Sequence, residues 1–163
     1  MDNEPSHPFQ VSGIPAYVVD EFRQLPDDEL KKRRAIRVVA DTKPGFPCRV
    51  SLKDAEVGET VFLFNFEHLA GDSPYRSAGP IFVRESATET YSRKNEFPDV
   101  LRVPGRLFSV RAYDENDMLV AADVVASADL DQVIQRLLSD KKTVYLHVHN
   151  ARPGCYSCRI DRV

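Results

Sequence analysis

The alternation of apolar and polar side chains is most regular near the C-terminus, over the segment TVYLHVHNARPGCYSCRI at residues 143–160. It has period two on both sides of a short break containing Asn, Pro and Gly. This pattern predicts two antiparallel strands joined by a turn at 150–154. One face is expected to join the core and carries Val144, Leu146, Val148, Tyr156, Cys158 and Ile160. The other face is expected to carry three facing pairs: His149 with Cys155, His147 with Ser157, and Tyr145 with Arg159.

Shorter segments of the same kind predict strands at 9–14, 35–40, 60–66, 81–84, 107–113 and 118–125, with a long loop at 69–80. Helical spacing predicts helices at 15–25, 27–34 and, most clearly, 129–138. The hairpin around the sequence DEND is expected to pair Arg111 with Val120 and Phe108 with Asp123. The predicted fold class is α+β: a mostly antiparallel sheet of short strands and hairpins with two or three helices, the last helix, at about 129–138, packed on the sheet.

Composition and charge narrow the class of protein. A chain of 163 residues, 42% hydrophobic and 29% charged, is expected to form a single globular domain over 1–163, with residues 1–8 flexible. The net charge of −3 argues against nucleic acid as a partner, and no apolar run suits a membrane span. The first residues lack the pattern of a secretory signal. Three cysteines without a repeated spacing suggest no disulfide framework, so a cytoplasmic location is expected.

The His147-x-His149 pair is the first chemical candidate, because two imidazoles on one side of a strand suit a shared metal ion. In the expected register Cys155 would supply a third ligand, and Glu67 or His68 a fourth. Zinc or iron is the ion such a set would hold.

Thiol chemistry and anion binding are the alternatives. His149 or a nearby arginine could activate Cys155 as a nucleophile, although nothing in the sequence marks an oxyanion hole. Arginine forks suit carboxylate or phosphate, and several arginines lie at strand ends or in loops that contain Gly or Pro. The expected ligand-binding residues are His147, His149, Cys155 and Arg159, with Cys48, Arg49, Tyr75 and Arg76 contributed by loops. Cys155 and Cys158 also form a C-x-x-C, but opposite faces of one strand do not suit a redox pair.

Several long segments together resemble one family: DTKPGFPCRVSLKDAEVGE, Asn65-x-Glu67-His68, SPYRSAGPIFVRE and HVHNARPGCYSCRIDR. They are similar to a bacterial family known only as domain of unknown function 1203, over about residues 22–162. The resemblance marks residues such as Cys48, His68, His147 and His149 as motif positions and assigns no chemical role to any of them.

The leading functional hypothesis is therefore a site for a small ligand, anionic in one version, on the His/Cys/Arg face of the last hairpin. The first alternative is a metal- or thiol-dependent enzyme that uses His147, His149 and Cys155. The second is a module for oligomerisation or interaction without catalysis, with a homodimer as the simplest form. The 44–49 loop and the 143–160 hairpin lie far apart in sequence, so the sequence does not decide whether they form one site.

Overall fold

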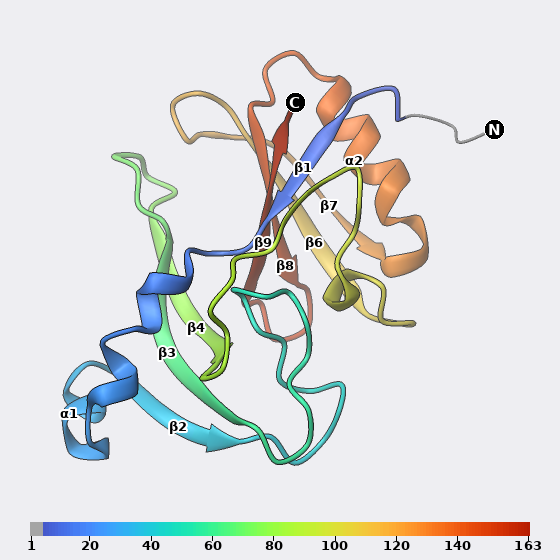
Figure 1. Ribbon diagram of the computed structural model, residues 1–163. Helices are drawn as coiled ribbons and strands as arrows, with labels where there is room; N and C mark the ends of the chain where they lie inside the picture. The colour runs from blue at the N-terminus through green and yellow to red at the C-terminus, as the bar shows by residue number, and fades with distance from the viewer. Residues whose placement is uncertain (1–4) are drawn as a thin grey trace.

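A computed structural model of the chain describes residues 5–163, and its strands form two antiparallel sheets (Figure 1). The larger sheet has the order β5-β1-β9-β8-β6-β7, with strands Ser92–Lys94, Phe9–Ser12, Tyr156–Arg162, Tyr145–Asn150, Leu107–Tyr113 and Leu119–Ala126. The smaller sheet has the order β2-β3-β4, with strands Ala35–Val39, Thr60–Leu69 and Ser77–Arg84. The α+β class and the antiparallel pairing are confirmed, whereas the expectation of one sheet is corrected to two.

Helices are few and short. The α-helices are α1 at Asp27–Lys32 and α2 at Leu130–Ser139, and single 3-10 turns lie at Ala16–Val19 (η1), Phe22–Gln24 (η2), Asp99–Leu101 (η3) and Ser127–Asp129 (η4). The helix expected at 15–25 is instead two separate 3-10 turns, each of which has a single buried residue, Val19 or Phe22, and no side-chain N-cap to support a longer helix. None of the helices among residues 5–163 has the length and apolar character needed to cross a membrane.

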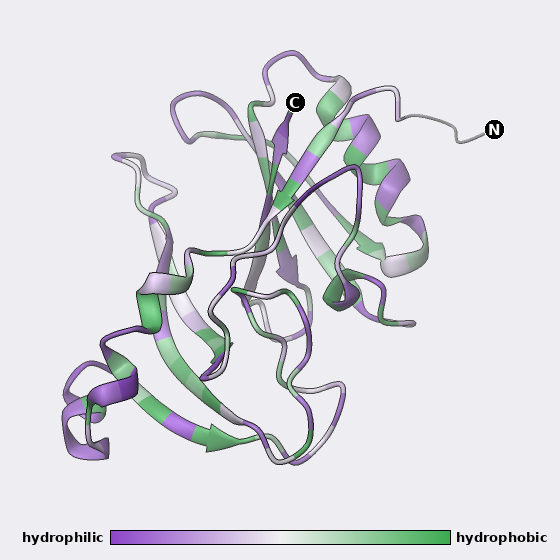
Figure 2. Cartoon of the chain, viewed as in Figure 1, coloured by the Kyte–Doolittle hydropathy of each residue, from purple (hydrophilic) through white to green (hydrophobic). Residues whose placement is uncertain are grey.

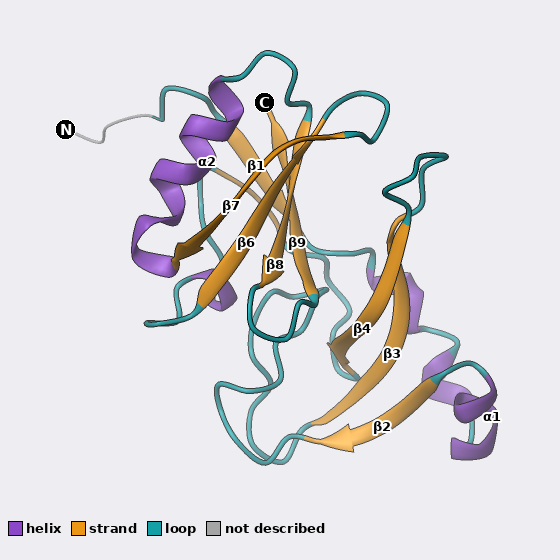
Figure 3. Cartoon of the chain, turned by 180° about the vertical axis from the view of Figure 1, so that it is seen from behind, coloured by secondary structure: helices purple, strands orange, loops and turns teal. Residues whose placement is uncertain are grey.

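The packing of α2 on the larger sheet is confirmed (Figures 1 and 3). Its buried residues Leu130, Ile134, Leu137 and Leu138 meet the core face of β6, β8 and β9, where Val110, Leu146, Val148, Cys158 and Ile160 are buried. In Figure 2 the green, hydrophobic residues of α2 alternate with purple ones along the helix, as an amphipathic helix requires. This core holds one face of the last hairpin and leaves its other face toward the smaller sheet.

A second core lies between the two sheets. Phe62, Phe64, Ile81 and Val83 of β3 and β4 pack there with Cys48, Val50 and Tyr156. Tyr156 was expected on the α2 side of the hairpin and lies on the opposite side, and Val144 is exposed rather than buried. The 44–49 loop therefore reaches the last hairpin through this second core.

Both predicted hairpin registers are wrong by two residues, for the same reason. His147 lies opposite Arg159 and Val148 opposite Cys158, and in the other hairpin Phe108 lies opposite Val125 and Arg111 opposite Ala122. In each hairpin the loop is one residue longer than expected, and a β-bulge adds one more, between Val148 and His149 or between Ala112 and Tyr113. Because side chains alternate with period two, a shift of two keeps most of them on the predicted face.

The β3–β4 hairpin is longer than predicted. β3 continues through His68 to Leu69, and β4 begins at Ser77, so the loop expected at 69–80 covers only residues 70–76. Gly79 and Pro80 look like loop residues, but β4 is an edge strand, where a proline without an N–H is tolerated. The extension matters because it carries His68 to the last hairpin.

The flexibility expected at residues 1–8 falls in part on residues 1–4, which lie outside the described residues. In the described remainder, the main chain of His7 bonds the Gln135 side chain of α2 through both its N–H, at 2.9 Å, and its carbonyl, at 3.1 Å.

Candidate metal centre

Three of the four histidines of the chain meet between the two sheets. His68 comes from β3, whereas His147 and His149 come from β8. Each ring offers a nitrogen that lies within 4.8 Å of a nitrogen on the other two. His147 and His149 are 2% and 1% exposed, and His68 is half-buried at the open side of the group. We call these three residues the histidine cluster.

Backbone irregularities aim these side chains at one another. The β3–β4 ladder shifts register between Glu67 and Leu69, on either side of His68. The β8–β9 ladder shifts register between Val148 and His149. A β-bulge bends its strand and redirects side chains, and bulges are frequent beside functional sites. Two independent bulges therefore place two of the three imidazoles.

Hydrogen bonds fix the tautomer of His149. Its Nδ1 lies 3.0 Å from the carbonyl oxygen of Gly154 in the turn of the last hairpin. A carbonyl oxygen only accepts, so Nδ1 carries the proton and donates it, and the neutral ring keeps its lone pair on Nε2. That arrangement is typical of histidine ligands of metals, whose second nitrogen donates to a carbonyl or carboxylate. Nε2 of His68 lies 3.2 Å from the hydroxyl of Ser77, which can orient that ring in the same way.

Each ring also has a buried nitrogen without a hydrogen-bond partner among the described residues. These atoms are Nδ1 of His68, Nδ1 of His147 and Nε2 of His149. Buried polar atoms almost always have a partner, so unsatisfied nitrogens in three adjacent rings require an explanation. A bound metal ion is an explanation that accounts for all three nitrogens together.

Burial keeps the cluster neutral. Desolvation lowers the pKa of His147 to about 2 and that of His149 to about 4, and it also lowers the pKa of His68. The positive charge of Arg111 lowers all three further. Neutral imidazole is the form that binds metals, so the rings need not lose a proton at neutral pH.

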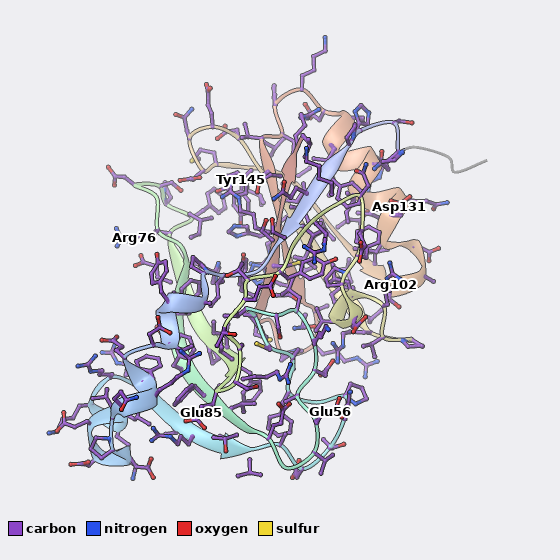
Figure 4. All side chains as sticks on the ribbon, viewed as in Figure 1. Glu56, Arg76, Glu85, Arg102, Asp131 and Tyr145 are labelled. Atoms are coloured by element: carbon purple, nitrogen blue, oxygen red, sulfur yellow. The ribbon has the colours of Figure 1, made fainter. Side chains whose placement is uncertain are left out.

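Aromatic rings enclose the cluster. The Tyr156 ring stacks on His68, with centroids 5.1 Å apart, and meets His147 edge-on at 5.0 Å. Tyr113 and Tyr145 lie 5.4 Å and 5.1 Å from the His147 ring. In Figure 4 the labelled Tyr145 lies between the β3–β4 hairpin and the strands of the larger sheet. These rings pack against the imidazoles and hold them in place.

Two arginines flank His147 on the sheet. Arg111 of β6 and Arg159 of β9 are its neighbours in the two ladders. Arg159 is paired with Asp161 at 2.8 Å and lies over the Tyr145 ring, 3.8 Å from its centroid. Arg111 contacts the Ser109 hydroxyl at 3.2 Å, and no carboxylate of residues 5–163 forms a salt bridge with it. Arg111 is thus the cation available to an anion at the cluster.

Several predicted site residues lie away from the cluster. Glu67 is exposed and pairs with Arg76, which points outward from the β3–β4 tip in Figure 4. Tyr75, which precedes Arg76 in the loop between β3 and β4, lies edge-on to Tyr113 with ring centroids 6.1 Å apart. Consecutive strand residues face opposite sides, so of the pair Glu67 and His68 only the histidine turns inward.

Cys155 is not across the ladder from His149, because His149 pairs with Tyr156. The sulfur of Cys155 instead accepts a hydrogen bond from Arg49, 2.9 Å away. Cys48 is fully buried in the second core, where its sulfur accepts from the Arg84 amide at 3.3 Å. The 44–49 loop and the last hairpin therefore meet at Cys155 and Arg49 and not at the histidines.

Sequence reasoning did not select Arg111, Tyr113 or Tyr156 for the site. Tyr156 was assigned to the core by its alternation, which the bulge before His149 reverses. Arg111 and Tyr113 enter the site because β6 pairs with β8, two strands that belong to different hairpins and are separated in the chain by β7 and α2. No local signal marks such a pairing.

Comparison with known proteins gave one result. The family model described as "Protein of unknown function (DUF1203)" matches residues 45–162, which include the whole histidine cluster. No curated protein and no solved structure matches the chain.

Proposed function

Because the chain belongs to this family of unknown function, we propose its function from geometry: a divalent metal centre, held by His68, His147 and His149, that takes a small anionic ligand. The carrying observation is the convergence of three neutral imidazoles from two sheets, each with an unsatisfied buried nitrogen. The small anionic ligand was the leading hypothesis from the sequence, and a metal ion belonged to the first alternative. The proposed site combines the two.

The cluster fits a metal ion of the zinc type. Zn–N bonds of about 2.0–2.1 Å at a tetrahedral angle place two ligand nitrogens roughly 3.4 Å apart. The nitrogens of the cluster lie within 4.8 Å of one another, so rotation of the imidazoles would close the site. Three protein ligands leave a fourth position open, as in catalytic rather than structural zinc sites. Imidazole ligands also suit iron, which is the second candidate.

The charge of the site favours an anion in the open position. The three imidazoles are neutral ligands, so they leave the ion's charge uncompensated. Arg111 adds a further positive charge on the same face of the sheet, next to His147. When bound, the ion would supply a Lewis acid and a water of lowered pKa. This chain would supply the aromatic enclosure and the guanidinium that positions a carboxylate or phosphate.

The test is a titration of metal-free protein with Co²⁺, which reports ligand geometry through its visible spectrum. We expect one Co²⁺ per chain with the intense bands of a tetrahedral site, and loss of these bands in His147→Ala. The matched control is His7→Ala, because both hydrogen bonds between the fourth histidine and Gln135 use the main chain of His7, which the substitution keeps. Identical spectra for the two variants would refute the centre.

A second experiment tests whether the metal centre binds an anion. Acetate added to the Co²⁺ protein is expected to change the spectrum of the wild type and to act much more weakly on Arg111→Gln. An equal response of both proteins would remove Arg111 from the site while leaving the metal centre intact.

The proposal also covers the cellular location of the protein, the redox state of its cysteines and its oligomeric state. We propose that it acts in the cytoplasm, where its three cysteines, all free in the structure, remain thiols. Neither nucleic acid nor a membrane is among the proposed partners. Formation of a homodimer is retained as the alternative for the case in which no metal binds, and a sizing measurement on the wild type would detect it.

A further inference from the structure

A cleft of about 430 Å³ lies on the other side of the turn that joins β8 to β9, and none of the three histidines lines it. Its walls come from the 45–49 loop, residues 103–107 and the turn that joins β8 to β9. His149 turns toward the cluster, and the next residue, Asn150, lines the cleft. Consecutive strand residues face opposite sides, so the His149 side chain points to the histidine cluster and the Asn150 side chain points to the cleft.

The cleft is positively charged. Arg49, Arg106 and Arg152 line it, and no aspartate or glutamate does. Asp54 lies outside the cleft, 3.7 Å from Arg106. Arg152 is exposed, and none of the side-chain hydrogen bonds or salt bridges among residues 5–163 involves it. Arg106 is therefore already paired with a carboxylate, whereas Arg49 and Arg152 have no acidic partner among residues 5–163 and leave a positive charge that an anion can neutralise.

Arg49 is an unusual residue in this wall, because its side chain is 1% exposed and all its partners are uncharged groups or sulfur. It donates to the carbonyl oxygen of Tyr156 at 2.7 Å, to that of Pro47, and to the Cys155 sulfur at 2.9 Å. A buried charge without a counter-ion is costly, so a charge of opposite sign is expected close by.

Cys155 is the cleft residue whose side chain contacts the Arg49 guanidinium. Its sulfur accepts from Arg49 and, at 3.5 Å, from the side-chain Nδ2 of Asn150. It is partly exposed and lines the cleft, whereas Cys48 and Cys158 are 0% exposed. The remaining walls, Val103, Pro104 and Leu107, are apolar. The cleft therefore presents cations and a thiol beside a surface suited to a hydrocarbon body.

We propose that this cleft binds a small organic anion, a carboxylate or a phosphate ester, with its charged group against Arg49 and Arg152 and its apolar part against Val103 and Leu107. The Cys155 sulfur then lies beside the charged group of the bound molecule. The cleft and the histidine cluster share no side chain, and Arg49 reaches the cluster only through its hydrogen bond to the main-chain carbonyl of Tyr156.

The test compares the alkylation rates of Cys155 by iodoacetate and by iodoacetamide, which differ in charge and hardly in size. In both reactions the sulfur forms a bond to the CH₂ carbon, iodide leaves with the electrons of the C–I bond, and the thiol proton passes to solvent. Mass spectrometry of the peptide that contains Cys155 reports the extent, in protein treated with chelator. Cys155→Ser provides the blank.

We expect the iodoacetate-to-iodoacetamide rate ratio at Cys155 to exceed that of free glutathione by roughly tenfold, the effect of one charge-assisted hydrogen bond. Arg152→Gln should lower the ratio severalfold. Arg136→Gln, an exposed arginine on α2 that pairs with Asp123, should leave it unchanged. A ratio equal to that of glutathione in the wild type, or equal ratios in the two variants, would overturn the proposal.

Competition identifies the anion. Butyrate and inorganic phosphate are each tested for protection of Cys155 against iodoacetamide: protection by butyrate assigns a carboxylate and protection by phosphate assigns a phosphate ester. Protection by neither at concentrations that saturate ordinary arginine sites would overturn the proposal. Repeating the measurement in His147→Ala separates the two sites, because the cleft is expected to respond as in the wild type whatever that variant does to metal binding.

Discussion

The imidazole of His68 lies parallel to the phenol ring of Tyr156, with ring centroids 5.1 Å apart and an angle of 4° between the planes. His68 belongs to β3 of the smaller sheet and Tyr156 to β9 of the larger one, so this stack joins the two sheets at the histidine cluster. Tyr156 is buried and also meets His147 and His149 edge-on. One ring therefore supports all three proposed ligands.

Removal of the Tyr156 ring should weaken metal binding more than removal of its hydroxyl. Tyr156→Leu loses the stack, an interaction worth about 0.5–1.5 kcal/mol, and frees His68 to rotate. We expect its metal affinity to fall roughly tenfold, as measured by competition with a chromophoric chelator. Tyr156→Phe keeps the ring and should bind as the wild type does. Equal affinities for the two variants would show that the stack does not position His68.

Metal-free protein should lose stability in mild acid. The pKa values of His68, His147 and His149 are lowered in the folded protein, so below pH 6.5 the unfolded chain binds protons that the folded chain does not. The free energy of unfolding should therefore be highest above pH 6.5. It should fall as the pH drops toward 4, by up to about 1.4 kcal/mol per pH unit for each imidazole that stays neutral.

Urea unfolding at a series of pH values in the presence of chelator measures this slope. His147→Gln removes one of the titrating groups and should flatten the slope between pH 6.5 and 4. A slope equal to that of the wild type would mean that His147 takes up its proton in the folded protein as easily as in the unfolded chain.

The turn that holds His149 offers a test with a matched control. Gly154 has φ +79°, its amide bonds the Asn150 carbonyl at 2.8 Å, and its own carbonyl accepts from His149. Gly154→Ala should cost about 1 kcal/mol of stability, because a side chain disfavours positive φ, and it should also weaken metal binding. Gly58 has φ +92° in a turn away from the cluster, and neither glycine has an atom within 4 Å of an added Cβ.

Gly58→Ala should therefore lose similar stability in a thermal melt and keep the wild-type metal affinity. If both alanine variants retain full affinity, the Gly154 carbonyl is not what orients His149.

Gly13 controls the position of the loop that carries Arg49. The amide of Ile14 bonds the Arg49 carbonyl at 2.8 Å, and a Cβ at Gly13 would overlap the carbonyl oxygens of Val50 and Arg49, the latter at 2.7 Å. Because backbone cannot rotate away, Gly13→Ala should destabilise the protein by about 1–3 kcal/mol in urea unfolding. Gly79→Ala on β4 meets nothing within 4 Å and should be nearly neutral. A stable Gly13→Ala protein would show that the approach of β1 to this loop is looser than described.

The sequence predicts most strands, the last helix and the face of His147, because these depend on period-two or helical patterns within one segment. The expected six-residue face of the hairpin is only partly correct. A shift of two residues leaves His147, Tyr145 and Arg159 on the same side, as the period requires. Because of the bulge before His149, Tyr156 and not Cys155 lies opposite this histidine. The Cys155 sulfur instead accepts a hydrogen bond from Arg49.

The third histidine is less accessible to sequence reasoning. His68 was one of two alternatives beside Glu67, and its place depends on the length of β3, on a bulge and on the docking of one sheet against the other. None of these is encoded within a single segment. Likewise the proximity of Arg49 and Cys155, 106 positions apart, arises from the core between the sheets and not from any motif.

The metal content of the purified protein is the most direct measurement of the central proposal. Wild-type protein loaded with zinc and freed of unbound ion by gel filtration should contain about one zinc ion per chain by elemental analysis, and His7→Ala should contain the same. His68→Ala, His147→Ala and His149→Ala should each lose most of it while keeping the wild-type circular dichroism spectrum. A wild-type protein that retains no zinc, or single histidine variants that retain as much zinc as His7→Ala, would contradict a metal centre at this cluster.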